Sequence, residues 1–122
     1  MIVAGFGFTT SATFDSLKQA LDATGYAMQI DGVATAADKT QTPAFVDFAK
    51  AQECAVFKVA TTEIKATQTQ TQSPISARER GTGSVAEAAA LSAAGPGATL
   101  IISRQISNDR MATCAIAKGP NL

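Results

Sequence analysis

Runs of apolar and polar residues predict strands and helices that alternate along the first part of the chain. Residues 2–8 are almost entirely apolar, which is typical of a buried strand, and we expect a glycine turn at its end. Apolar residues then recur at helical spacing from Phe14 to Leu21, after candidate N-caps in residues 9–13. Gly25 is expected to end this helix.

The rest of the chain continues the alternation with one interruption. Residues 61–75 are rich in Thr and Gln and have no period that would bury one face, so we expect a long surface loop with room for a short helical turn. The other predicted elements are, in chain order, a short strand at 31–36, a helix that opens at Pro43, a strand at 55–59, a helix at 84–94, and strands at 98–103 and 111–117.

This order of elements predicts an α/β fold with a mostly parallel sheet of about five strands and helices on both faces. Only about seven residues join the last two strands, which is too few for a parallel crossover. These two strands are therefore expected to be antiparallel, which makes the sheet mixed.

The composition fits one domain over residues 1–122 and excludes several kinds of chemistry. Basic and acidic residues number 10 each, so the chain lacks the positive excess of a nucleic-acid-binding module. It contains no His, which excludes Ser-His-Asp and Cys-His catalysis and histidine-based metal sites. Any catalysis would have to use carboxylates, amines, guanidinium groups, hydroxyls, thiols or backbone groups.

Cys54 and Cys114 lie in apolar runs and are expected to be small buried core residues. Two thiols without histidine make a poor metal site, so we expect neither a metal nor a cofactor. The apolar N-terminal stretch is too short for a signal peptide or a membrane span. We therefore expect a cytoplasmic protein whose partners include neither membrane nor nucleic acid.

Two glycine-containing segments are candidate anion sites. Gly5-Phe6-Gly7 precedes the hydroxyls of Thr9, Thr10 and Ser11 at the start of a predicted helix, an arrangement that suits a carboxylate or phosphate. The alternative is a tight turn that only needs small residues. A dinucleotide-binding fingerprint would need a third glycine where the chain has Thr10.

The second segment runs from Gly81 through Gly83 into an alanine-rich helix. Ser84 and Glu87 have the spacing of a capping box, in which Ser84 caps the helix and Glu87 reaches back to it. This assignment is purely structural, and the alternative is again an anion site at a helix start.

Three stretches of the chain closely resemble the CobE/CbiG C-terminal domain family of cobalamin (vitamin B12) biosynthesis, in its stand-alone CobE-like form. They are Gly5-Phe6-Gly7-Phe8, Gly83-Ser84-Val85-Ala86-Glu87-Ala88-Ala89-Ala90-Leu91 and Met111-Ala112-Thr113-Cys114-Ala115-Ile116-Ala117. The resemblance implies a three-layer α/β/α sandwich. It also implies a protein of the aerobic pathway that binds or hands on a corrin or precorrin intermediate. Other corrin-pathway enzymes and a second copy of the chain, in a homodimer, are further candidate partners.

Such a ligand is a large apolar ring fringed with carboxylates, which arginine binds well. The chain's basic residues favour its second half: residues 1–61 hold four lysines and six acids, and residues 62–122 hold six basic residues and four acids. Arginine occurs only there, at 78, 80, 104 and 110, in segments expected to be loops. The candidate ligand-binding residues are Gly5, Phe6, Gly7, Thr9, Thr10, Ser11, Arg78, Arg80, Gly81, Gly83, Ser84 and Arg104.

Two other functions stay open from the sequence. One is a hydrolase acting on a precorrin lactone or acyl group, as the longer CbiG proteins of the family do, with Glu87 or Glu63 as the base. The other is a small nucleotide- or phosphate-binding module. The sequence leaves open which intermediate binds, whether it carries cobalt, and whether the chain catalyses a reaction.

Overall fold

Five strands form a single sheet in the order β3-β2-β1-β5-β4. The structure is a computed structural model that describes residues 1–64 and 82–119, with side chains from Val85 onward in the second range. β1, β2 and β3 are parallel, and β5 is antiparallel to both β1 and β4. Four strands thus share one direction, which confirms the predicted mixed sheet. The strands are β1 (Ile2–Phe8), β2 (Gly32–Ala36), β3 (Ala55–Val59), β4 (Thr99–Ile106) and β5 (Ala112–Lys118).

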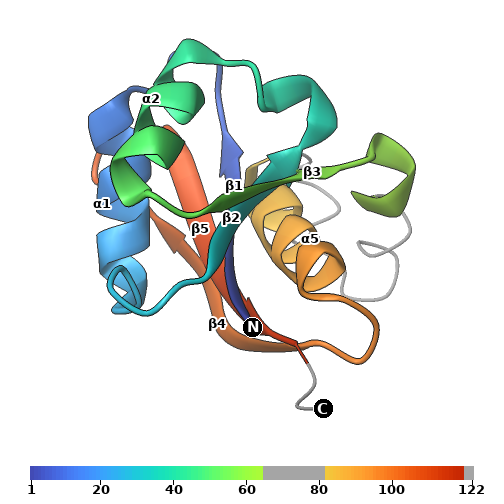
Figure 1. Ribbon diagram of the computed structural model, residues 1–122. Coiled ribbons are helices and arrows are strands. Elements are labelled where there is room, and N and C mark those ends of the chain that lie inside the picture. Colours follow the sequence, from blue (N-terminus) through green and yellow to red (C-terminus); the bar gives the residue numbers. More distant parts are fainter. Residues whose placement is uncertain (65–81, 120–122) are drawn as a thin grey trace.

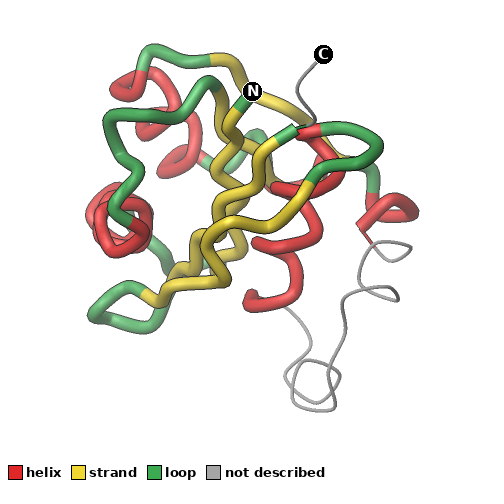
Figure 2. The backbone as a smooth tube through the Cα atoms, turned by 90° about the horizontal axis from the view of Figure 1, so that it is seen from below, coloured by secondary structure: helices red, strands yellow, loops and turns green. Residues whose placement is uncertain are grey.

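Helices cover both faces of this sheet. α1 (Phe14–Thr24) and α2 (Pro43–Gln52) lie on one face, and α5 (Thr82–Ala94) lies on the other (Figure 1). The view from below shows the strands as the middle layer of three (Figure 2). A short 3-10 helix, η1 (Ala37–Lys39), joins β2 to α2, and residues 61–64 form the short helical turn that the sequence allowed for.

The central strand β1 is buried because it supplies side chains to two separate cores. Ala4, Phe6 and Phe8 belong to the core beneath α1 and α2. Val3 belongs to the core beneath α5. This alternation follows from the two-residue period of a strand, and it explains why β1 is an unbroken apolar run in the sequence.

Gly5 lies in the middle of β1, where it is paired with Ala34 of β2 and Ala115 of β5. The predicted glycine turn is therefore wrong: Gly5 and Gly7 are strand residues. A Cβ atom on Gly5 would lie 2.2 Å from the carbonyl oxygen of Ala86 and 2.4 Å from the backbone nitrogen of Ala90. Glycine is needed here because α5 packs directly on the strand backbone, with no room for any side chain.

The alanines of α5 serve the same contact from the other side. Ala88, Ala89, Ala90 and Ala94 are buried against the sheet. Small side chains on a helix let its axis approach the strands closely, and glycine in the facing strand shortens the distance further. The two segments interpreted from the sequence as anion sites thus meet one another in a helix-to-sheet contact.

Candidate functional site: the carboxyl edge of the sheet

The carboxyl ends of β1, β2 and β4 lie at one edge of the sheet, because these strands share one direction. We call the segments gathered there the carboxyl edge: residues 9–11 after β1, residues 37–40 after β2, the β4–β5 turn at residues 107–111, and the first turn of α5. Open α/β sheets bind ligands at this edge. Five of the candidate residues named from the sequence lie on it: Thr9, Thr10, Ser11, Gly83 and Ser84.

The N-terminus of α1 is capped by the chain's own side chains. Thr13 is the N-cap, its hydroxyl accepts from the Ser16 backbone N–H, and the Ser16 hydroxyl accepts from the Thr13 N–H in a reciprocal capping box. Buried Ser16 also donates to the Asp109 carboxylate at 2.5 Å. Because Ser16 uses its own proton for Asp109, Thr13 must donate the proton between the two hydroxyls, which are 3.1 Å apart. The Asp109 carboxylate is thus held beside the start of α1 by the Ser16 side chain.

Asp109 holds the β4–β5 turn in place. Besides Ser16, its carboxylate accepts from the hydroxyl of Ser107 at 2.5 Å and from the backbone N–H of Met111 at 3.0 Å. These hydrogen bonds, first from Ser107 and then from Ser16 and Met111, hold the pKa of Asp109 below its usual value because they favour the ionised form. One carboxylate thereby fastens the end of the sheet to the start of α1.

Replacing Asp109 with asparagine is expected to lower stability at neutral pH and to leave it nearly unchanged in acid. The folded state depresses this pKa, so the carboxylate stabilises the fold above its unfolded pKa of about 3.9, and this contribution is lost as the pH falls through the lower folded value. Urea unfolding of both proteins from pH 7 to about pH 2, well below the unfolded pKa, measures the difference. A difference that stays constant with pH would contradict the role of the charged carboxylate.

The β4–β5 turn is also tied to the end of β1. The Thr9 backbone N–H donates to the carbonyl of Met111 at 2.9 Å, and the Thr9 hydroxyl lies 3.4 Å from the Met111 sulfur. Thr9 is half-buried, whereas Thr10 and Ser11 are exposed. On the neighbouring strand end, the Lys39 ammonium lies 5.6 Å from the centroid of the Phe8 ring.

Arg104 lies inside β4 and not in the loop that the sequence predicted, because the strand continues to Ile106. The pairing with β5 shifts register between Ile102 and Gln105, which marks a bulge in β4. The bulge leaves the Arg104 backbone N–H outside the regular ladder, and Glu87 of α5 accepts from it at 3.2 Å. Glu87 therefore fastens α5 to the bulge.

The predicted capping box of Ser84 and Glu87 is wrong. α5 begins at Thr82, so Ser84 lies within its first turn and not at the N-cap, and the Glu87 carboxylate accepts from the backbone of β4. Gly83 is in that first turn as well. Arg78, Arg80 and Gly81 lie outside the described residues.

The other candidate residues take part in contacts within the fold. Phe6 is fully buried among the rings of Phe45 and Phe48. Glu63 accepts from the Ser92 hydroxyl at 2.9 Å, five residues along α5 from Glu87, so the two candidate bases face different parts of the helix. Because Gly5 and Gly7 are strand residues, they do not form the loop that a dinucleotide-binding fingerprint requires.

Burial raises the pKa of both cysteine thiols. Cys114 is fully buried, as the sequence predicted, and burial alone raises its pKa. Cys54 is half-buried, and its pKa is raised first by burial and then by the negative charge of Asp31. Neither environment activates a thiol for nucleophilic attack.

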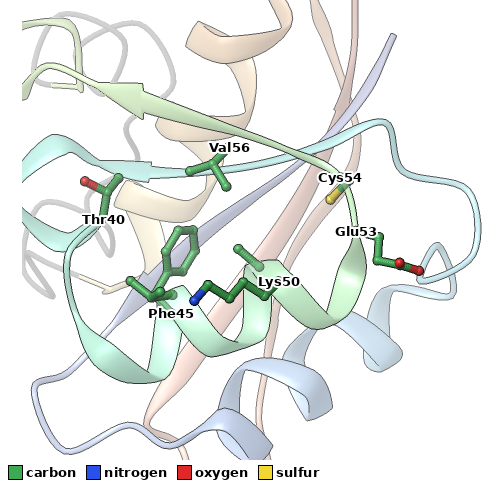
Figure 3. A pocket seen from close by; sticks show the side chains of 8 residues that line it. Thr40, Phe45, Lys50, Glu53, Cys54 and Val56 are labelled. Carbon is green, nitrogen blue, oxygen red and sulfur yellow. The ribbon is translucent and has the colours of Figure 1, made fainter.

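A pocket of about 320 Å³ lies away from these candidates, between α2 and the outer strand β3. Phe45 extends from α2 toward Val56 of β3, and the Glu53 carboxylate points away at the far end (Figure 3). None of the candidate residues lines it. The lining residues are Thr40, Phe45, Val46, Ala49, Lys50, Glu53, Cys54 and Val56.

Sequence reasoning missed Asp109, Ser16 and Lys39 as residues of this edge. A local signal existed for one of them, because Ser107-Asn108-Asp109 between two strands is typical of a turn held by side-chain oxygens. Within residues 1–64 and 82–119, no helix is long and apolar enough to cross a membrane. Over the same residues, no three His, Cys, Asp or Glu side chains gather where they could hold a metal ion.

Comparison with known proteins supplies the remaining evidence. Residues 2–117 match the family described as Cobalamin synthesis G C-terminus. The structure is similar to cobalamin biosynthesis protein chiG from Agrobacterium tumefaciens, with 31% identity, a TM-score of 0.76, and coverage of 99% of this chain and 100% of that one. It is also similar to CobE from the cobalamin (vitamin B12) biosynthetic pathway, with 26% identity, a TM-score of 0.78, and coverage of 96% and 89%.

A cobalamin biosynthesis protein G homolog from Sulfolobus solfataricus has the same fold at 19% identity and a TM-score of 0.72, with coverage of 99% of this chain and 37% of that one. No match was found among curated proteins. The family match spans nearly all of the sequence and agrees with the motifs at residues 5–8, 83–91 and 111–117. The chain therefore belongs to the CbiG C-terminal family of cobalamin synthesis proteins.

Proposed function

We propose that the protein binds a corrin or precorrin intermediate of cobalamin biosynthesis at the carboxyl edge and hands it on to another enzyme of the pathway. The observation that carries this proposal is the family match over nearly the whole chain, together with cations on or next to that edge. Lys39 follows β2, Arg104 lies at the bulge of β4, and Arg110 lies in the β4–β5 turn. Corrin intermediates carry several carboxylates, which pair with such cations.

Binding is favoured over hydrolysis by the state of the candidate bases. The Glu87 carboxylate is engaged by the backbone of β4, and Glu63 is engaged by Ser92 at another level of α5. A general base needs to reach the proton it removes, and these two groups do not converge on one position. The raised pKa values of Cys54 and Cys114 also argue against a thiol nucleophile.

The pocket beside α2 is a weaker candidate for this ligand. Its volume of about 320 Å³ is at the lower end of the range of roughly 300–1,000 Å³ that encloses drug-sized molecules. A corrin ring with its acid side chains is larger than such molecules. The carboxyl edge offers the cations Lys39 and Arg110, which suit a ligand that carries several carboxylates.

The likeness to stand-alone CobE supports a place in the aerobic branch of the pathway. The test is to purify the protein alongside the intermediates of that branch and to record its visible spectrum. We expect a corrinoid chromophore to co-purify with it. A colourless protein that also fails to bind added cobyrinic acid, a corrin with free carboxylates, would contradict the proposal.

The alternative function is hydrolysis of a precorrin lactone or acyl group. It rests on the family membership, because the resemblance to the longer CbiG proteins implies this chemistry. Mass analysis of the bound chromophore distinguishes the two functions. An unchanged ligand mass after prolonged incubation supports binding alone. A gain of one water indicates that a lactone has been opened, and loss of the acyl group, released as a carboxylic acid, indicates hydrolysis of an acyl group.

A further inference from the structure

The conformation of Arg110 is unusual for its position. The β4–β5 turn is closed by a hydrogen bond from the Arg110 backbone N–H to the Ser107 carbonyl at 2.9 Å. Arg110 then adopts a φ of 62°, in the left-handed region that hairpin turns ordinarily fill with glycine. The turn itself needs no side chain at this position, so a long cationic one calls for another explanation.

The Arg110 side chain is not held by its acidic neighbour. The Asp109 carboxylate accepts from Ser16, Ser107 and the Met111 N–H, which leaves it committed to the fold. Arg110 is exposed, and its hydrogen bond to Ser107 uses only its backbone N–H. The surface pair of Asp109 with Arg110, which sequence proximity suggests, is not among the ion pairs of the described residues.

The β4–β5 turn that carries Arg110 lies within the carboxyl edge. This turn follows β4, and the hydrogen bond between Thr9 and Met111 joins it to the end of β1. Among the other basic residues there, Lys39 lies over the ring of Phe8. Arg110 is thus a guanidinium carried on a turn that is fixed at both ends.

We infer that Arg110 binds a carboxylate of the ligand at the carboxyl edge, and that Asp109 is the positioning residue that fixes its turn. This inference rests on the proposed function and names one of its binding residues. A guanidinium matches a carboxylate with two parallel hydrogen bonds, which lysine cannot reproduce. Arginine in this left-handed conformation is strained, and glycine would not be. Strained residues of this kind are typical of functional sites.

The test compares Arg110→Gly with Glu53→Gly. Glu53 has a φ of 53° at the C-terminus of α2, so it shares the left-handed conformation but lies beside the other end of the sheet. We expect both substitutions to keep or raise the melting temperature, because glycine adopts this conformation freely. Only Arg110→Gly should weaken binding of cobyrinic acid, by about tenfold or more, and it should also reduce the salt dependence of binding.

Two further measurements make the result specific. Arg110→Lys should recover only part of the affinity for cobyrinic acid. Cobinamide is a corrin whose acid side chains are amides, and its affinity should be the same for the wild type and Arg110→Gly.

If the wild type binds cobyrinic acid and Arg110→Gly binds it equally well, the role of Arg110 is wrong and the proposed function stands. If the wild type binds neither corrin, both are wrong. A fall in melting temperature confined to Arg110→Gly would assign the side chain to the fold and overturn the inference.

Discussion

Replacing Gly5 with alanine is expected to lower the free energy of unfolding by about 3 kcal/mol or more, which places it among the most damaging single substitutions in this chain. The new Cβ would lie 2.2 Å from the Ala86 carbonyl oxygen and 2.4 Å from the Ala90 nitrogen. Both are backbone atoms, so no side chain can turn aside, and α5 as a whole would have to move off the sheet. Urea unfolding followed by circular dichroism measures the loss.

A second-site substitution distinguishes backbone crowding from side-chain crowding. The Cβ of Ala90 would also lie 2.8 Å from the new methyl group, so Ala90→Gly removes one of the three close contacts. We expect the double variant Gly5→Ala, Ala90→Gly to be no more stable than Gly5→Ala alone, because the two backbone contacts remain. Recovery of most of the stability would show that α5 has room to adjust.

The substitution Phe6→Ala is expected to cost about 4 kcal/mol, in the range usual for deleting a buried aromatic side chain. Phe6 is fully buried, and its ring meets Phe48 edge-on at 5.2 Å and Phe45 at 6.1 Å between centroids. Its removal leaves a cavity between β1 and α2 that the packed rings cannot fill. The same unfolding measurement applies.

Phe14→Ala is the matched control for this aromatic cluster. The Phe14 ring contacts Phe48 at 5.9 Å but is only half-buried, so its loss should cost clearly less than the loss of Phe6. Phe6→Leu, which keeps most of the volume, should also be milder than Phe6→Ala. Equal losses for Phe6→Ala and Phe14→Ala would contradict the placement of Phe6 at the centre of this core.

Both substitutions concern residues that the sequence offered as ligand-binding candidates. Gly5 attracted that interpretation because glycine beside a predicted strand end is typical of a phosphate loop, and Phe6 lies next to it. Glycine is also required wherever two backbones approach closely, and a single sequence does not distinguish these causes. The resemblance to the family was nevertheless carried by the right residues, since the motifs around Gly5 and Ala90 are the two sides of one contact.

The elements and their order follow from local sequence. A strand buries alternate residues and a helix buries every third or fourth, so β1, α1, β3 and β5 leave patterns that can be recognised within a few residues. The short connection before β5 fixes its antiparallel direction, because a parallel crossover would not fit. The N-cap of α1 was expected within residues 9–13 and is Thr13, because capping depends only on residues next to the helix start.

The carboxyl edge depends on contacts that no local pattern contains. Ser16 and Asp109 are 93 residues apart, and Glu87 meets the Arg104 backbone only because β4 bulges where α5 begins. Such pairs arise from strand register, from the depth at which α5 packs on Gly5, and from the angle at which the β4–β5 turn meets α1. Each is settled by the packing of the whole chain, because side chains distant in sequence reach hydrogen-bonding distance only after the core has fixed the layers that carry them.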